Sequence, residues 1–413
     1  MSINLGIIGC GCIARAHLNA LKELKERGLL EGVSVRALCD RERWKAESLL
    51  KRGEGPPQLP GVGPVGDPMQ APPVWVSDFQ PEPLPEVYDD YRRLLARTDI
   101  DAVLILTSVN THHSIGLEAL RAGKNILIEK PLAVTVKAAR RLVEEAGRRG
   151  LSAGVAECVR YLPSVRMAHW AFEQDHLGRP QFSVFAAAAG YWAPDKIVAR
   201  TAWRHRKELG AGGVAVDWMV HFFHQLRYVM GEIEEVSAIA RTLEPVRTTR
   251  DETGRVLESV QAETDDTLSC ALSYANGAAG SVFVSWAGHG AELELPPAFY
   301  GSKGCLQGER LVLDGREPAA LTEFFERHAD PAVKARYFPH GITHLFTLEL
   351  LDFLNAVKEG RDMETSVEEG LKDLAVCFAA LDSSVGKKAV RVADVLSGRS
   401  DRYERDINRR CGI

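Results

Sequence analysis

The sequence predicts an α/β protein with two domains: a doubly wound parallel sheet over about residues 1–155, and an α+β domain with a large open, mostly antiparallel sheet over residues 156–413. A length of 413 residues is more than one core usually organises. Strand and helix patterns alternate through the first 155 residues, as they do in parallel sheets with crossover helices. Beyond them the strands lengthen, and turn signals such as Asn276-Gly277 separate neighbouring strands.

Short apolar runs predict the strands of the first domain at residues 5–8, 33–39, 102–106, 125–128 and 152–156. Helices are expected between these strands. The first spans residues 14–27 and ends before Gly28, and others follow Asp40 and precede Gly123. Thr135 is a good N-cap for a helix that runs to about Arg149.

In the second domain, residues 267–274 and 279–286 predict two antiparallel strands around the Asn276-Gly277 turn. Residues 214–230 are almost wholly apolar and predict one buried helix. Two further helices, over residues 343–358 and 366–386, close the chain. We therefore expect an open sheet with helices on one face.

A proline-rich segment interrupts the first domain. Half of the twenty prolines lie between Pro56 and Pro85, which is too many for a regular helix or sheet. The segment predicts a long surface insertion over about residues 54–86. Two interpretations stay open: a disordered linker, or a loop that packs on a partner subunit or borders the active site.

The composition favours a soluble globular enzyme, with 45% hydrophobic and 26% charged residues. The net charge is −5 and the basic residues are scattered, which argues against nucleic acid or an anionic membrane as a partner. No apolar run reaches the roughly 18 residues of a membrane span, and the first residues lack the features of a secretory signal. Eight dispersed cysteines predict reduced thiols in a cytoplasmic protein.

A glycine-rich turn follows the first strand and opens the first helix. Gly9 permits the tight turn, Gly11 lets main-chain N–H groups approach a pyrophosphate, and Ala14 packs the helix closely on the sheet. Cys12 and Ile13 complete the turn and are counted with the cofactor-binding residues. The strand before the turn and the helix after it are the context that a dinucleotide-binding fingerprint requires.

Asp40 closes the second strand, where a carboxylate can bind the ribose hydroxyls of the adenosine. A carboxylate there would repel a 2′-phosphate, so NAD is the expected cofactor. Arg41 and Arg43 follow directly and could accommodate that phosphate, so NADP stays as the alternative.

Lys130 lies at the carboxyl end of a parallel strand, between Glu129 and Pro131. Doubly wound folds bind their ligands at this edge. A lysine there could hydrogen-bond a reacting hydroxyl group and stabilise developing alkoxide charge. The alternative is a surface Lys–Glu pair before a helix.

Asp217, His221 and His224 fall at positions i, i+4 and i+7, so on one helix they share a stripe. Polar groups within so apolar a segment cost free energy unless they find partners or do chemistry. They could be catalytic groups, ligands of Zn or Mn, or core histidines with satisfied hydrogen bonds.

These residues belong to an ordered set that resembles the glucose-fructose oxidoreductase / inositol dehydrogenase (Gfo/Idh/MocA) family. The resemblance covers nearly the whole chain. Its motifs are Gly9 to His17, Thr107 with His112, Ala119-Leu120, Gly123, Glu129-Lys130-Pro131, Arg160-Tyr161 with Pro163, Trp203-Arg204, Gly212-Gly213, Asp217 with His221, and Gly301 to Gly304.

The resemblance implies a Rossmann domain and an α+β domain whose open sheet builds a homodimer or homotetramer. It implies an NAD(P)-dependent dehydrogenase of sugars, cyclitols or their derivatives. Thr107, His112 and Glu129 are then expected on the cofactor side. Lys130, Asp217 and His221 match the family's active-site lysine, aspartate and histidine.

Chemistry suggests the role of each matched residue. His221 is the natural general base, because imidazole titrates near neutrality. Asp217 could orient that imidazole or hydrogen-bond the substrate. Lys130 would make the hydroxyl group more acidic while hydride leaves its carbon for the nicotinamide ring.

The chain also departs from the family pattern. Ser108-Val109 follow Thr107 where proline and asparagine are usual, which puts the nicotinamide-side contacts in doubt. His224 stands where the family often has aspartate, so the charge of the substrate pocket differs. The proline-rich insertion is unusual as well.

Beyond the trio, the expected substrate-binding residues are Arg160, Tyr161, Trp192 and Trp203. The tryptophans could stack on a sugar ring or fill the core. Arg160 and Tyr161 could line the site after the last strand of the first domain, although Arg160 could equally form a surface ion pair.

The main functional hypothesis is oxidation of a secondary hydroxyl of a pyranose, cyclitol or glycoside by NAD. A second hypothesis keeps NAD bound and uses transient oxidation to eliminate a glycosidic bond, as a lyase or glycosidase would. A third is a cofactor-binding regulator without turnover, although Lys130 and His221 would then have no purpose.

Overall fold

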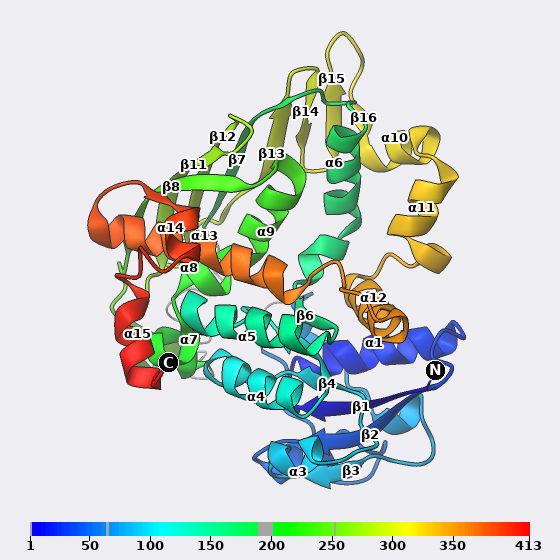
Figure 1. The fold of residues 1–413 in the computed structure, drawn as a ribbon. Helices are drawn as coiled ribbons and strands as arrows, with labels where there is room; N and C mark the ends of the chain where they lie inside the picture. The colour runs from blue at the N-terminus through cyan, green and yellow to red at the C-terminus, as the bar shows by residue number, and fades with distance from the viewer. Residues whose placement is uncertain (1, 63–65, 189–200, 252) are drawn as a thin grey trace. The chain divides into compact units, whose positions relative to one another are not determined.

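The computed structural model describes residues 2–62, 66–188, 201–251 and 253–413. The chain forms two compact units (Figure 1). The first comprises Met1–Val134, Ala138–Glu157 and Phe346–Leu371, and the second comprises Thr135–Lys137, Cys158–Leu345 and Lys372–Ile413. No helix of the described segments is long and apolar enough to cross a membrane.

The first unit is built on a six-stranded parallel sheet with the order β3-β2-β1-β4-β5-β6. Its centre is apolar, as both faces of a doubly wound sheet must be. The order reverses between β1 and β4, and the predicted parallel fold is confirmed. The strands are β1 (Ile3–Ile8), β2 (Val33–Cys39), β3 (Glu86–Tyr88), β4 (Ala102–Ile105), β5 (Asn125–Glu129) and β6 (Ala153–Ala156).

Helices cover this sheet. The predicted first helix is α1 (Ala14–Glu26), which buries Leu18, Leu21 and Leu24. The helix expected after Asp40 is only five residues long. The others are α2 (Arg43–Glu47), α3 (Tyr91–Leu95), α4 (Val109–Arg121), α5 (Val136–Arg149) and, from Phe346 onward, α12 (Leu345–Glu359).

The segment Phe346–Leu371 returns to the first unit after the chain has passed through the second. The Ser152 hydroxyl donates to the main-chain oxygens of Ala356 and Arg361, at 3.1 and 2.7 Å. Val155 N–H donates to the Thr365 carbonyl oxygen at 2.9 Å. This segment therefore completes the β6 side of the Rossmann sheet.

The described residues of the proline-rich insertion pack on the first unit. Arg15 of α1 donates to the main-chain oxygens of Leu59 and Met69, each at 3.0 Å. Val74, Val76 and Phe79 are buried. The segment also forms two single-turn 3-10 helices, η1 (Pro68–Gln70) and η2 (Val76–Asp78), the first with proline at its first position.

The second unit contains a nine-stranded sheet with the order β16-β15-β14-β13-β7-β12-β11-β8-β17. Only β7 and β12 pair in parallel; every other neighbouring pair is antiparallel. The hairpin predicted around Gly277 joins β11 to β12 and is confirmed. The strands are β7 (Pro180–Ala188), β8 (Ile233–Arg241), β11 (Thr267–Tyr274), β12 (Ala279–Ser285), β13 (Leu293–Gly301), β14 (Gly304–Gln307), β15 (Arg310–Leu313), β16 (Ala319–Ala320) and β17 (Val390–Arg391).

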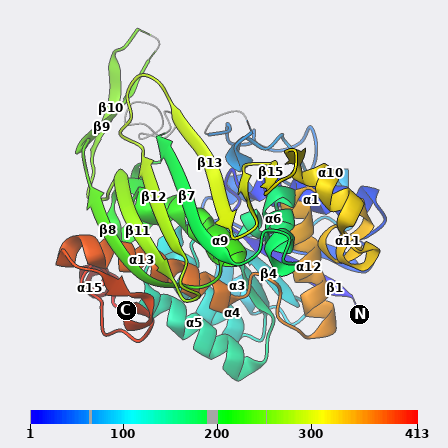
Figure 2. The ribbon, with the colours of Figure 1, turned by 90° about the horizontal axis from the view of Figure 1, so that it is seen from above.

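Helices cover one face of this sheet (Figure 2). The other face carries exposed apolar side chains. The rings of Phe185 on β7 and Phe222 on α9 stack at 4.0 Å on the covered face. The helices are α6 (Pro163–Glu173), α7 (Lys207–Gly210), α8 (Val214–Asp217), α9 (Met219–Met230), α10 (Leu321–His328), α11 (Pro331–Tyr337), α13 (Val367–Gly386), α14 (Val392–Leu396) and α15 (Glu404–Cys411). A separate hairpin of β9 (Val246–Arg250) and β10 (Val256–Gln261) projects from the sheet in Figure 2.

Candidate active site

The glycine turn has the geometry that its sequence predicted. Gly9 has a φ of +99°, and a Cβ at this position would lie 2.5 Å from the Leu106 carbonyl oxygen. Only glycine fits there without displacing the end of β4. At Gly11, by contrast, a Cβ would meet no atom within 4 Å, so the main chain is open to a ligand.

The N-terminus of α1 is suited to a pyrophosphate. The helix begins at Ala14, which is fully buried, and its first turn contains no acidic residue. The positive end of the helix dipole is therefore not compensated by a side chain of that turn. Cys12 and Ile13, at the mouth of the turn, are half-buried. These residues fit the diphosphate of a dinucleotide.

Asp40 is fixed at the end of β2. Its two carboxylate oxygens accept hydrogen bonds from the main-chain N–H groups of Cys10 and Glu42, both at 2.9 Å. Arg43 is directed elsewhere, because it donates to Glu47 at 2.8 Å and to the Val87 carbonyl oxygen at 3.1 Å. A carboxylate held here favours ribose hydroxyls over a 2′-phosphate. Arg41 is exposed beside it.

Glu129 holds the main chain of Lys130 in place. One carboxylate oxygen of Glu129 lies 3.0 Å from His17 Nε2, and the other accepts the Lys130 N–H at 3.0 Å. Burial alone would raise the pKa of Glu129, but His17 and Lys130 outweigh burial and hold that pKa below its usual value. Glu129 is therefore anionic behind Lys130, and His17 is a supporting residue that the sequence did not single out.

His112 ties two strand ends together from inside the core. Its Nδ1 lies 2.9 Å from the Pro131 carbonyl oxygen, and its Nε2 lies 2.9 Å from the Thr107 carbonyl oxygen. Burial lowers the pKa of His112, so the ring is neutral near pH 7 and donates to one carbonyl at a time. The structure thus brings His112, Thr107, Glu129 and Lys130 together at the carboxyl edge of the sheet.

In the second unit, the single helix expected over residues 214–230 is divided. It consists of α8, which ends at Asp217, and α9, which begins at Met219. Asp265 anchors the first part: its carboxylate oxygens accept the N–H groups of Gly213 and Ala215 at 2.9 and 2.8 Å. Asp217 and His221 therefore belong to two successive helices rather than to one.

Asp217 pairs with Arg204, a residue that was not among the expected site residues. The Arg204 Nε donates to Asp217 at 2.8 Å, and its guanidinium lies 4.2 Å from the centre of the Trp203 ring. Both charged side chains are largely buried. Arg204 thus contacts both Trp203 and Asp217, and the adjacent Trp203-Arg204 pair in the sequence was the signal available for Arg204.

His224 is buried and belongs to a charged cluster. Its Nδ1 lies 2.7 Å from Asp373, and Arg227 also hydrogen-bonds that carboxylate. Burial alone would raise the pKa of Asp373, but the two basic partners outweigh it and hold the pKa below its usual value. Asp373 lies about 150 residues away in the sequence, so no local pattern could reveal it.

We expect Asp373→Asn to destabilise the protein by about 1.5–3 kcal/mol at pH 7, because it removes the buried carboxylate that accepts from Arg227 and leaves Arg227 only its pair with Glu232. The folded-state pKa is depressed, so this stabilisation is complete above the unfolded pKa of about 3.9 and is lost as the pH falls through the folded value. Urea unfolding at pH 7 and at pH 3 measures both effects. The exposed Asp362→Asn serves as the control; equal stability of the two variants at pH 7 would contradict the prediction.

Of the other expected substrate-binding residues, Tyr161 and Arg160 pack against neighbouring side chains of the second unit. Tyr161 is fully buried, with the guanidinium of Arg166 4.8 Å from its ring centre. The guanidinium of Arg160 lies 3.8 Å from the centre of the Tyr228 ring. Trp192 lies outside the described residues.

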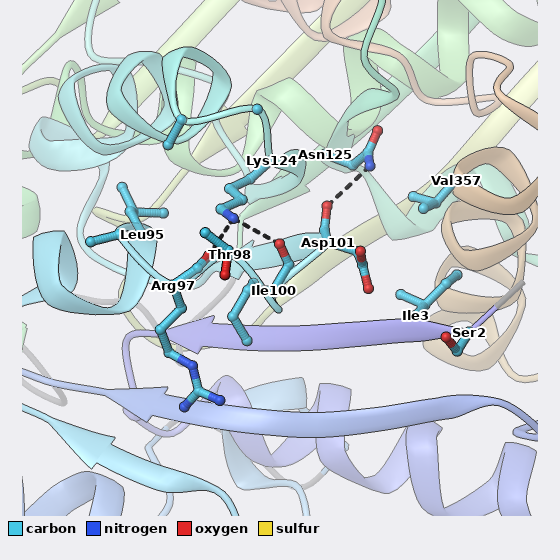
Figure 3. A pocket seen from close by; sticks show the side chains of 13 residues that line it. Ser2, Ile3, Leu95, Arg97, Thr98, Ile100, Asp101, Lys124, Asn125 and Val357 are labelled. Carbon is cyan, nitrogen blue, oxygen red and sulfur yellow. Dashed lines mark hydrogen bonds between the residues drawn. The ribbon is translucent and has the colours of Figure 1, made fainter.

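Across residues 2–62, 66–188, 201–251 and 253–413, no group of three or more His, Cys, Asp or Glu side chains is arranged to hold a metal ion. A cavity of about 560 Å³ lies in the first unit between Ser2, Arg97, Lys124 and Val357 (Figure 3).

This cavity lies at the amino ends of β4 and β5, the edge opposite the glycine turn. The Lys124 ammonium donates to the carbonyl oxygens of Arg97 and Ile100, at 2.6 and 2.8 Å (Figure 3). Asp101 accepts the Asn4 N–H at 2.8 Å. Because these groups stabilise the fold and ligands bind at the carboxyl edge of such sheets, we do not assign the cavity to the cofactor.

Comparisons with known proteins agree with this architecture. Levoglucosan dehydrogenase from Pseudarthrobacter phenanthrenivorans is 25% identical over 74% of this chain and 83% of its own. Myo-inositol 2-dehydrogenase from Thermotoga maritima is 25% identical over 75% of this chain and 85% of its own. The crystal structure of a levoglucosan dehydrogenase with NADH and levoglucosan shares the fold, with a TM-score of 0.73 and 20% identity over 95% of this chain and 100% of that one.

Two family models match the two parts of the chain. Residues 3–157 match the oxidoreductase family with an NAD-binding Rossmann fold, and residues 165–307 match the GFO/IDH/MocA C-terminal domain. The fold, the glycine turn, the fixed Asp40 and the two matches lead to one conclusion: the chain belongs to the Gfo/Idh/MocA family of NAD-binding oxidoreductases.

Proposed function

We propose that the protein is an NAD-dependent dehydrogenase that oxidises a secondary hydroxyl group of a sugar, cyclitol or glycoside. One observation supports this best: the open glycine turn follows β1 and Lys130 follows β5, so both lie at the carboxyl edge of the parallel sheet in the first unit. There the anionic Glu129 fixes the main chain of the lysine. A merely structural Lys–Glu pair on the surface would not require a buried carboxylate with two donors.

Each residue has a chemical task in this proposal. Bound NAD supplies the ring that accepts hydride from the substrate carbon. Lys130 donates a hydrogen bond to the substrate oxygen and stabilises negative charge on it. His221 takes the hydroxyl proton, and Asp217, with its charge balanced by Arg204, orients the base or the substrate.

The substrate class rests on the relatives. Two of them are named as dehydrogenases of levoglucosan, an anhydrosugar, and of myo-inositol, a cyclitol. Trp203, next to the Arg204–Asp217 pair, offers an apolar ring face beside hydrogen-bonding groups, which is the combination that a pyranose or inositol ring requires. We therefore assign Trp203 and Asp217 to substrate binding, together with His221.

The test is a screen of pyranoses, anhydrosugars, inositols and glycosides with NAD and, separately, with NADP. With NAD, we expect the absorbance of NADH to rise with at least one ring polyol. With NADP and the same compound, we expect a smaller rise, from NADPH. Product release without net NADH would instead indicate oxidation followed by elimination. NAD binding by calorimetry with no turnover of any compound would refute the enzymatic proposal.

We also propose that the exposed face of the nine-stranded sheet binds a second copy of the chain, giving a homodimer or homotetramer. Phe182, Ile239 and Phe283 are 41%, 56% and 39% exposed. The strand register places all three on the face opposite Phe185, which packs against α9. So many large apolar side chains on one sheet face are characteristic of an interface.

We expect the double substitution Ile239→Glu and Phe283→Glu to produce a monomer, because it places charges in the centre of this interface. Light scattering coupled to size exclusion measures the mass. Val385→Glu is the matched control, since Val385 is 56% exposed but lies on helix α13. An unchanged mass for the double variant would show that the sheet face is not the interface.

We assign a separate role to each of the two parts of the chain. Residues 1–155 bind the dinucleotide, and residues 156–413 bind the substrate and form the oligomer. We place the enzyme in the cytoplasm, because eight cysteines dispersed along the sequence are typical of a protein whose thiols a reducing compartment keeps reduced.

A further inference from the structure

A carboxyl group is enclosed in the first unit without any visible partner. Glu349 lies on α12, is 0% exposed, and neither of its oxygens has a hydrogen-bond partner in the described part of the chain. Its helix neighbours Leu348, Leu350 and Leu351 are buried as well. Buried polar atoms are rarely left without a partner in native proteins, so this group needs an explanation.

The surroundings of Glu349 keep it neutral. Burial raises the pKa of Glu349 well above its usual value, and the nearby carboxylates of Glu129, Glu157 and Asp352 raise it further. No cation within the described residues is hydrogen-bonded to it. A neutral carboxylic acid, unlike a carboxylate, has an O–H group to donate.

His17 offers the acceptor that such a donor requires. Its Nε2 lies 3.0 Å from the anionic Glu129 and donates to it, and in the neutral ring the other nitrogen, Nδ1, is a hydrogen-bond acceptor. This Nδ1 is buried and has no hydrogen-bond partner among the described residues. A lone acceptor and a lone donor are therefore buried in the same unit.

Two contacts place α12 beside His17. The ring of Phe346, one turn before Glu349, meets the edge of the His17 ring with 5.3 Å between centres. The Thr347 hydroxyl donates to Glu23 of α1 at 2.6 Å. Glu349 is also close enough to Glu129, the partner of His17, for that charge to affect it. A buried water with polar groups around it could bridge the remaining gap.

We propose that Glu349 is a positioning residue for Lys130: as a neutral acid it donates through one buried water to His17 Nδ1 and completes a relay from Glu349 through His17 and Glu129 to the Lys130 main-chain N–H. This rests on the proposed role of Lys130 in the dehydrogenase. Donation to Nδ1 fixes the ring orientation of His17, and the fixed His17 holds the Glu129 carboxylate. The position of Lys130 then depends on a residue more than two hundred positions later in the chain.

The relay predicts a pH effect with a definite sign. When Glu349 ionises at high pH, the donor to His17 is lost and a negative charge appears near Glu129, Glu157 and Asp352. Lys130 and the neutral His112 are the remaining titratable groups around Glu129. Turnover is therefore expected to fall on the alkaline side in the wild type. A glutamine at this position keeps an N–H donor and cannot ionise, so Glu349→Gln should lose this alkaline limb.

Three variants of the full-length protein test the relay. Glu349→Gln should retain turnover within about threefold, and Glu349→Met should lose at least about tenfold in kcat with little change in the Kd for NAD. Because methionine fills the site without an unsatisfied polar group, Glu349→Met should unfold at the same temperature as the wild type or higher. Glu359→Gln, at the exposed end of the same helix, is the matched control.

Infrared spectroscopy tests the relay without any substrate. The wild-type minus Glu349→Gln difference spectrum at pH 7 should contain the carbonyl band of a protonated carboxylic acid, and the Glu359→Gln difference spectrum should not. Wild-type turnover in Glu349→Met, or absence of that band, would overturn the proposal. If no sugar is oxidised, the band still reports on Glu349, so failure of the relay and failure of the proposed function can be told apart.

Discussion

Replacing Lys130 with alanine should reduce turnover at least about 100-fold, and His221→Ala should do the same, while both variants keep NAD affinity close to that of the wild type. The lysine acts on the charge that develops on the substrate oxygen, and the histidine accepts its proton. Both effects occur in the transition state rather than in cofactor binding. Steady-state kinetics with the best substrate and calorimetry with NAD measure the two quantities separately.

Matched controls exist for both substitutions. Lys137 is exposed seven residues after Lys130, and its side chain donates to the main-chain oxygen of Ile413 at 2.9 Å. His289 is exposed and pairs with Glu244 at 3.0 Å. Alanine at either control position should leave kcat unchanged. Full turnover by Lys130→Ala or His221→Ala would remove the role proposed for that residue.

The largest loss of stability is expected from Gly213→Ala. A Cβ at residue 213 would lie 1.6 Å from the Asp265 carbonyl oxygen, which is main chain and cannot rotate away. The new atom would push Asp265 from its hydrogen bonds with Gly213 and Ala215, and it would displace the start of α8. We expect a loss of more than about 4 kcal/mol in the free energy of unfolding, or failure to fold.

Gly147→Ala is the matched control, because the same chemical change should have the opposite sign there. Gly147 is exposed on α5, and a Cβ would meet no atom within 4 Å. Alanine should stabilise the helix by about 0.5–1 kcal/mol. Denaturant unfolding of both variants is the measurement. A Gly213→Ala protein as stable as the wild type would show that the Gly213–Asp265 approach is not as close as described.

Elements could be predicted from the sequence wherever the local residue pattern agrees with the tertiary structure. The apolar runs of β1, β2, β4, β5 and β6 are buried on both faces, so they stand out in any window of the sequence. The glycine turn was recognisable because its glycines have specific backbone tasks. The hairpin around Gly277 was recognisable for the same reason, since Gly277 has a φ of +85°.

What escaped prediction depends on contacts between distant residues. The strand β3 is three residues long and half-exposed, so it carries no apolar signal, and it forms because β2 offers a free edge. The start of α8 is held by Asp265, some fifty residues later in the sequence. The insertion is ordered by Arg15, whose buried guanidinium caps two of its carbonyl groups. No periodicity reports such pairings.

The residues of the candidate site also fall into those with a local sequence signal and those recognised only by distant contacts. Glycines, Asp40 and Lys130 could be named because their chemistry is tied to a position at the end of a strand. The groups that support them could not, since His17 looks like an ordinary helix residue and Glu349 like one more glutamate on an amphipathic helix. The roles of His17 and Glu349 depend on their burial near Glu129, which arises only when the chain folds.

The late return of Phe346–Leu371 to the first unit has a consequence for biosynthesis. During translation the nucleotide-binding half must wait for most of the chain to leave the ribosome before its last helix arrives. Until then the Ser152 hydroxyl and the Val155 N–H lack the carbonyl acceptors that this segment supplies, and the apolar surface that α12 covers stays exposed to water. The nascent chain therefore depends on chaperone protection for longer than a contiguous domain of the same size would.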